Sequence, residues 1–88
     1  MSANPSSAED NPRITIRVKG SDGSIQKFNI KKKDRFKKMM ERYAAIKNLD
    51  LRLISFHFNG NRLQPHDTPK GVEMKDEDTV NAFVIRVF

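Results

Sequence analysis

The sequence contains no cysteine and no tryptophan, and its four glycines are scattered singly along the chain. The absence of Cys excludes disulfides and thiol catalysis and suits a reducing compartment, so we expect a protein of the nucleus and cytoplasm. The scattered glycines form no phosphate cradle of the kind that nucleotide-binding enzymes use. No apolar run approaches the ~20 residues of a membrane-spanning helix, and the N-terminal residues lack a signal-peptide core.

Residue types that commonly carry catalysis or bind metals are also scarce. His57 and His66 are the two imidazoles, one on the polar side of an expected strand and the other in an expected loop. No Cys is present to complete a metal site with them. The acidic run KDED at 75–78 lacks the spaced ligands and the downstream Glu of a calcium loop. We therefore expect no catalytic residue, no metal site and no cofactor, and a protein that is not an enzyme.

What the sequence has in excess is positive charge. Its 17 Lys and Arg against 11 Asp and Glu give a net charge of +6 in a chain of 88 residues. A length of this order suits one small domain. The charge indicates acidic partners without distinguishing phosphates from carboxylates. It is concentrated in FNIKKKDRFKKMMERY, residues 28–43, where Lys and Arg alternate with large apolar side chains.

The N-terminal part predicts a tail and a hairpin. Residues 1–12 are rich in Ser, Asn, Pro and Ala without apolar periodicity, which is typical of a disordered tail before a domain over 13–88. Apolar residues then alternate over 13–19 and again over 24–31, which predicts two strands. Asp22-Gly23 supplies a hairpin turn between them. The second strand is expected at an edge of the sheet.

The next segment predicts an amphipathic helix. Asp34 is a plausible N-cap, and apolar residues recur at spacings of three and four up to a helix end near Asn48. Met39 and Met40 are adjacent, about 100° apart around a helix, so we expect one of them at the border of the buried face.

The C-terminal part predicts three more strands. Alternation over 53–58 leads through the turn pair Asn59-Gly60 into a short strand at 61–63. Residues 65–72 contain two prolines and are expected to form a loop. The last strand, 79–88, is apolar on both faces, which suggests a central strand. The order β-β-α-β-β-(turn)-β excludes ferredoxin-like and double-stranded-RNA-binding folds and predicts an α+β fold of the β-grasp type, a mixed sheet wrapped around one helix.

The basic run permits two functional interpretations. Lysines guard many edge strands, and Lys27, Lys31 and Lys33 fit that role. The same edge also accepts an extended peptide as an added strand. The alternative is a basic domain that binds nucleic-acid phosphates, although the exposed aromatic residues of single-strand binders are scarce.

Several stretches resemble the small ubiquitin-related modifier (SUMO) family. They are VKGSDGSIQKFNIK, FKKMMERYAAIKNL, FHFNGNRL, the DTP at 67–69, and MKDEDTVNAF, in the family's order and covering 13–83. The resemblance implies a ubiquitin-like protein modifier that recruits partners carrying short apolar motifs with acidic flanks. It also implies contacts with SUMO-activating and SUMO-conjugating enzymes, no membrane association and a monomeric state. A ubiquitin-like domain of a larger scaffold protein stays an alternative.

The resemblance also assigns site residues. The motif-binding groove would have an apolar floor of Phe28, Ile30, Met39 and Tyr43 and a basic wall of Lys31, Arg35 and Lys38. Asn29 and Ile46 stand where the family tends to carry basic residues, which predicts a weaker preference for acidic flanks there.

A second surface, for the conjugating enzyme, would comprise Asn59, Gly60, Arg62 and Asp78. Asn59 replaces an acidic residue of the family, which argues against tight binding at that surface.

The family's attachment chemistry uses a C-terminal diglycine, and the sequence has no Gly after Gly71. Three explanations stay open: a truncated or altered chain, a diglycine in sequence beyond Phe88, or a SUMO-like protein that does not conjugate.

Overall fold

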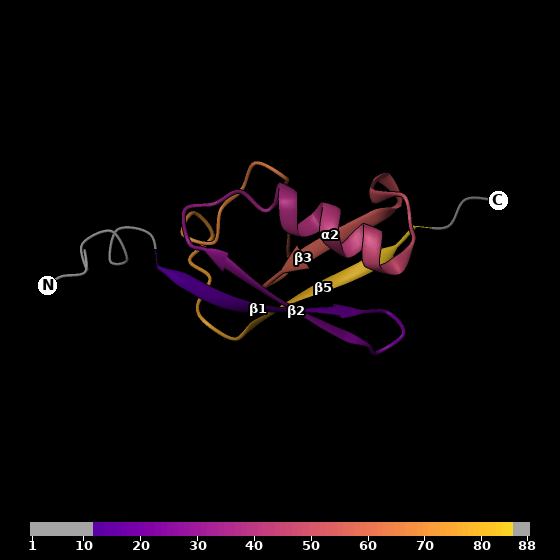
Figure 1. Cartoon of the computed structure of the whole chain (residues 1–88), viewed down its shortest axis with the longest axis horizontal. Coiled ribbons are helices and arrows are strands. Elements are labelled where there is room, and N and C mark those ends of the chain that lie inside the picture. Colours follow the sequence, from indigo (N-terminus) through magenta and orange to yellow (C-terminus); the bar gives the residue numbers. More distant parts are fainter. Residues whose placement is uncertain (1–11, 86–88) are drawn as a thin grey trace, which may run out of the picture.

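The computed structural model describes residues 12–85, so the expected tail lies outside the described residues except for Pro12, as do residues 86–88 of the expected last strand. Five strands form one sheet in the order β2-β1-β5-β3-β4, and helix α2 crosses one face of it (Figure 1). This confirms the predicted mixed sheet wrapped around a helix. The elements are β1 (Arg13–Gly20), β2 (Ile25–Lys31), α2 (Lys37–Lys47), a 3-10 turn η1 (Leu51–Leu53), β3 (Ile54–Phe58), β4 (Asn61–Arg62) and β5 (Asp78–Val84).

The hairpin β1–β2 is confirmed, with β2 at the sheet edge. Its inner face is apolar because Ile14 pairs with Ile30 and Ile16 with Phe28. Gly23 in the turn has φ +88°, a left-handed conformation that glycine adopts without steric cost.

Gly20, at the end of β1, is a position where a side chain would not fit. A Cβ there would lie 2.8 Å from Tyr43 Oη and 2.9 Å from Asp22 Oδ1. We expect Gly20→Ala to destabilise the fold by about 1–3 kcal/mol, since overfilled sites force their neighbours to move. Thermal unfolding should show a Tm lower by about 5–15 °C. The same substitution in a Tyr43→Phe background should cost less, and an equal loss in both backgrounds would refute the contact as the cause.

The start of α2 differs from the prediction, because Asp34 does not cap it. Asp34 lies in the turn after β2, where its N–H donates to the Lys31 carbonyl at 3.0 Å. The N-cap residue is Phe36, which makes no side-chain capping bond. Two amides at this end donate instead to backbone carbonyls of the loop after β4, from Phe36 to Asp67 at 2.9 Å and from Lys37 to Pro65 at 3.1 Å. The helix end is confirmed at Asn48, which is left-handed with φ 56°.

The paired methionines are placed as expected, because Met39 lies at one border of the buried face of α2, but this border is no more exposed than the rest. Met39 and Met40 are 1% and 2% exposed. The buried face of α2 runs from Met39 to Ala44, an arc of about 140° at 100° per residue, so two adjacent residues both fit inside it.

β5 is central as predicted, parallel to β1 and antiparallel to β3. Its two faces nevertheless differ. Val80 and Ala82 belong to the core, whereas Phe83 is 48% and Ile85 46% exposed. Although β5 has apolar residues on both faces, only the face with Val80 and Ala82 is buried.

The connections after β3 follow the prediction. Asn59 and Gly60 form the tight turn, with φ of 56° and 84°, and the segment from 64 to 77 is built of turns without strands. β3 begins at Ile54, one residue later than expected, because Leu53 belongs to η1.

Candidate peptide-binding groove

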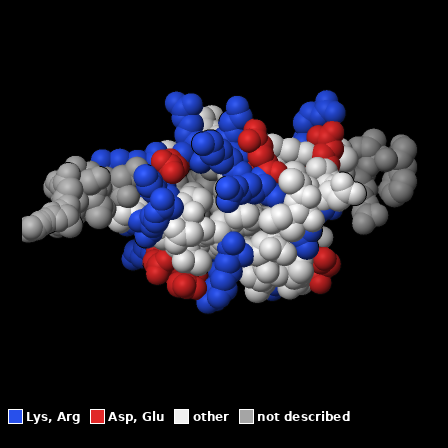
Figure 2. Space-filling model, viewed as in Figure 1, with Lys and Arg blue, Asp and Glu red and all other residues white. Residues whose placement is uncertain are grey.

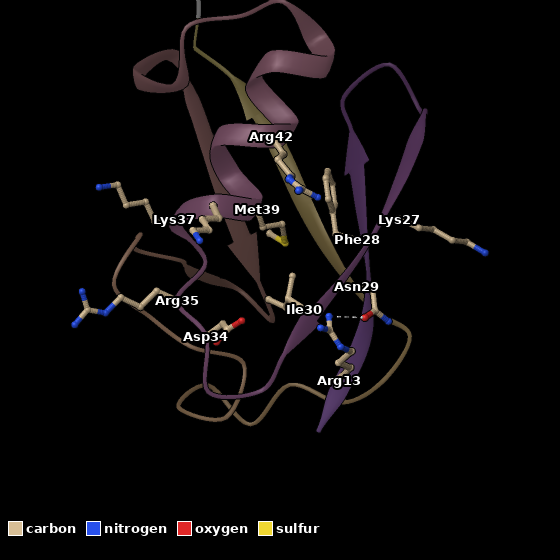
Figure 3. Close-up of a pocket in the computed structure, with 11 residues that line it drawn as sticks. Arg13, Lys27, Phe28, Asn29, Ile30, Asp34, Arg35, Lys37, Met39 and Arg42 are labelled. Atoms are coloured by element: carbon tan, nitrogen blue, oxygen red, sulfur yellow. Dashed lines mark hydrogen bonds between the residues drawn. The ribbon is translucent and has the colours of Figure 1, made fainter. Parts of the chain in front are cut away.

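A groove of about 600 Å³ lies between β2 and the N-terminal half of α2 (Figure 3). β2 forms one side of the groove and the helix forms the other. Its lining residues are Arg13, Lys27, Phe28, Asn29, Ile30, Asp34, Arg35, Lys37, Lys38, Met39 and Arg42.

Three of the four residues predicted for the apolar floor line this groove, namely Phe28, Ile30 and Met39. Tyr43 does not line it and lies beneath, 3% exposed. Its ring meets Phe28 edge-on at a centroid distance of 6.4 Å and Phe56 at 5.6 Å. Tyr43 therefore supports the floor from below. Burial raises the pKa of its hydroxyl, with a further contribution from the charge of Asp22, so the ring stays neutral near pH 7.

The predicted basic wall is partly reproduced. Arg35 and Lys38 line the groove, whereas Lys31 does not. Sequence reasoning missed Lys37 and Arg42 on the helix side. Arg42 follows Lys38 by four residues and Met39 by three, so helical spacing alone could have placed it on the same side.

Three further lining residues, Arg13, Lys27 and Asn29, come from the hairpin. Arg13 reaches the groove because β1 pairs with β2, where its Nη1 donates to Asn29 Oδ1 at 3.3 Å. Asp34 is the carboxylate of the lining. No local sequence signal indicates Arg13, since it depends on strand pairing.

The cations of the groove are not neutralised by ion pairs. Within residues 12–85, the ion pairs of Lys and Arg are Arg17–Glu77 at 2.8 Å, Lys47–Asp22 at 3.7 Å and Arg52–Asp50 at 2.8 Å, and none involves a groove residue. Hydrogen bonds from Arg52 hold the pKa of Asp50 at about 2, but this pair belongs to η1. Figure 2 shows several blue side chains gathered around a white central area on one face. The groove can therefore attract an acidic ligand.

The outer edge of β2 carries backbone N–H and C=O groups that do not bond to β1. The strand register identifies the residues to which they belong. The Gly20 N–H donates to the Ser24 carbonyl at 2.9 Å, and the Lys32 N–H to the Pro12 carbonyl at 2.8 Å. In an antiparallel pair, such hydrogen-bonded positions alternate with positions whose groups point away. The even-numbered residues of β2 therefore bond to β1.

The odd-numbered residues Lys27, Asn29 and Lys31 direct their N–H and C=O groups away from β1, toward the open edge. The Lys31 carbonyl already accepts the Asp34 N–H at 3.0 Å, so it is not one of the groups open to a peptide. Side chains alternate as well, so Phe28 and Ile30 face the helix while these three residues share the opposite face of the sheet. An extended peptide beside β2 would find backbone partners and apolar seats together.

The residues of the second predicted surface lie at one end of the sheet. Asn59, Gly60 and Arg62 are exposed in and after the β3–β4 turn. The β3–β5 register brings the first residue of β5, Asp78, toward this turn. Its carboxylate accepts a hydrogen bond from the Lys75 N–H at 2.8 Å, which closes the preceding loop.

Other kinds of site find little support in the described part of the chain. Between residues 12 and 85, no group of three His, Asp or Glu side chains could hold a metal ion. His57 packs edge-on against Phe83 at 5.3 Å, and the His66 side chain is 75% exposed in the loop. No helix in this part is long and apolar enough to cross a membrane.

Comparison with known proteins bears on the family. The family model described as "Ubiquitin-2 like Rad60 SUMO-like" matches residues 14–84. The chain belongs to this SUMO-like family. It is 40% identical over 75 residues to small ubiquitin-related modifier 2-A of Xenopus laevis and to small ubiquitin-related modifier 2 of Homo sapiens and Bos taurus. Each alignment covers 85% of this chain and 79% of the relative.

A solved structure supports the fold. Ubiquitin of Caldiarchaeum subterraneum superposes with a TM-score of 0.77 at 16% identity, covering 85% of this chain and 96% of that one. The SUMO-like chain thus has the ubiquitin-like β-grasp fold. Identity this low concerns the fold alone.

Proposed function

We propose that this SUMO-like chain acts as a recognition module rather than an enzyme, and that its groove binds an extended apolar peptide with acidic flanks, a SUMO-interacting motif. The observation that carries the proposal is the coincidence of an open strand edge, an apolar floor and unneutralised cations along β2 and α2.

In the proposed complex the peptide joins the edge of β2. Backbone hydrogen bonds align it, and the seats over Phe28, Ile30 and Met39 take its inward-facing apolar side chains. Arg35 and Lys38 attract its acidic flank and raise the association rate. A single strand in a groove of this size buries little area, so affinity should be about micromolar.

Contacts with the enzymes of the SUMO pathway are part of the proposal and rest on family membership. The exposed turn with Asn59, Gly60, Arg62 and the nearby Asp78 is the proposed surface for the conjugating enzyme.

Two substitutions test the groove. Ile30→Ala removes an apolar seat and keeps every charge, so peptide affinity should fall about fivefold or more with an unchanged salt dependence. Lys38→Ala removes charge alone, and should lower affinity less and flatten the salt dependence. Isothermal titration at several salt concentrations measures both. Ile85→Ala, an exposed Ile directly after the end of β5, is the control and should leave binding unchanged.

Nucleic-acid binding would give a different result. Neutralising several phosphates should cost roughly 10³-fold in affinity or more between 50 and 200 mM salt. Tight oligonucleotide binding with such a slope, together with an Ile30→Ala variant that binds peptide normally, would rule out the groove as the functional site.

A further inference from the structure

The sheet face that points away from helix α2 carries apolar side chains that the fold leaves uncovered. Phe83 is 48%, Ile85 46% and Leu53 39% exposed. Phe83 and Ile85 are two residues apart, so they share this outer face. The Ile85 N–H donates to the Leu53 carbonyl at 2.6 Å, which places Leu53 beside Ile85. We call Leu53, Phe83 and Ile85 the outer patch. Single exposed apolar residues are common, but adjacent ones mark interaction surfaces.

The neighbours of Phe83 hold its ring in place. The His57 ring meets it edge-on at a centroid distance of 5.3 Å. A hydrogen bond between Ser55 Oγ and His57 Nε2 fixes the imidazole in turn. Ser55 lies directly opposite Phe83 across the β3–β5 pair and is 8% exposed. An aromatic side chain that is already ordered loses little entropy on binding, which favours it as the anchor of an interface.

The rest of the outer face is basic. The strand registers place one row of residues across β1, β5, β3 and β4, namely Lys19, Asn81, His57 and Arg62. Neither end of this row, Lys19 or Arg62, forms an ion pair with a carboxylate within residues 12–85. No strand residue on this face of β1, β3, β4 or β5 is acidic. A partner that complements the face therefore brings acidic side chains together with apolar ones.

The backbone beneath the outer patch excludes an added strand. β5 bonds to β1 on one side and to β3 on the other, so it offers no open N–H and C=O groups to an extended peptide. The partner must therefore satisfy its own backbone groups. An α-helix does so, and its side chains at spacings of three and four form the apolar stripe that a flat patch can cover.

We propose that the outer face binds an amphipathic helix of another protein, whose apolar stripe covers the outer patch and whose acidic flank meets Lys19 and Arg62. A second copy of this chain fits less well. Three half-exposed side chains offer far less than the roughly 800 Å² per partner of a standard interface, and two copies would bring two basic faces together. The groove lies between β2 and α2, on the other side of the sheet, so the inference does not depend on peptide binding there.

A synthetic amphipathic peptide tests the proposal. It has about 18 residues, with Leu at helical spacings of three and four, Glu beside them and Ala elsewhere. Titrated into the isotope-labelled chain and followed by NMR, it should shift amides of residues 53–57 and 81–85, with an affinity of about 10–100 μM. A scrambled peptide of the same composition should not shift them. A peptide bound in the groove should not compete.

Variants locate the contact. Phe83→Ala should weaken helix binding about fivefold or more, since it removes the anchor. Lys19→Gln should weaken it about twofold and reduce its salt dependence. Arg62 is left unchanged, because it also belongs to the proposed surface for the conjugating enzyme. Ile46→Ala is the matched control, since Ile46 is 54% exposed on α2, and it should leave helix binding unchanged. Unchanged amide spectra away from each substitution verify folding.

Four results would overturn the proposal. The first is absence of binding, and the second is an equal response to the scrambled peptide or shifts confined to residues 27–42 of the groove. The third is a concentration-dependent dimer that Phe83→Ala abolishes, which would assign the outer patch to a second copy. The fourth is a single-stranded oligonucleotide that shifts the same amides and binds more tightly than the peptide.

Discussion

Replacing Phe36 by Ala should lower the free energy of unfolding by about 3–5 kcal/mol, the usual cost of emptying a buried Phe site. Phe36 is fully buried at the point where the helix meets the loop after β4. Its backbone bonds join the carbonyl of Asp67 and the amide of Met40, so a cavity there loosens both segments. A small domain has a total free energy of unfolding of about 5–15 kcal/mol, so this loss is a large share of its stability.

Thermal unfolding followed by circular dichroism should show a Tm lower by about 15–30 °C. Phe83→Ala is the matched control, because it removes the same side chain from a position that is 48% exposed. It should cost less than about 1.5 kcal/mol, since little surface returns to water. Equal losses in the two variants would mean that Phe36 does not anchor the core.

Asn29→Pro should reduce peptide affinity by at least about tenfold while leaving the fold intact. Proline removes the Asn29 N–H, which points to the open edge, and projects its ring toward the incoming peptide. The ladder with β1 does not use this N–H, and prolines are tolerated on edge strands for that reason. Titration of a motif peptide measures the loss.

Asn29→Ala separates the side chain from the backbone. It keeps the N–H and removes the acceptor of the Arg13 hydrogen bond, so it should change affinity far less than Asn29→Pro. A Tm within a few degrees of the parent chain verifies that the proline variant is folded. A folded proline variant that still binds at full affinity would show that the peptide does not pair with β2.

Local patterns sufficed for the strands and turns because their causes are local. Period-two alternation predicted β1, β2 and β3, and the pair Asn59-Gly60 predicted the turn between β3 and β4. The start of α2 was not predicted correctly, because it depends on residues that are distant in the sequence. Its first amides bond to carbonyls of Pro65 and Asp67, about 30 residues further along, so no nearby cap was needed. Asp34 has the right chemistry for a cap but is held in the turn after β2.

The same distinction applies to the groove. Phe28, Ile30 and Met39 were predicted from alternation, helical spacing and family resemblance, and all three line the groove. Whether they bind a peptide stays a prediction. Arg13 could not be found, because only the pairing of β1 with β2 brings it to the groove. Lys31 was assigned to the wall although alternation puts it on the opposite face of its strand.

The parallel pairing of β1 with β5 has a consequence for biosynthesis. Residues 16–20 join residues 78–82, so the sheet stays in two parts until residues 78–82 have been made. Closing such a long loop costs entropy that only the completed sheet repays, which makes folding slower than local contacts alone would allow. The hairpin and helix emerge from the ribosome first, with the second edge of β1 still unpaired. Charged side chains on an exposed strand disfavour its pairing with other chains, and β1 carries Arg17 and Lys19.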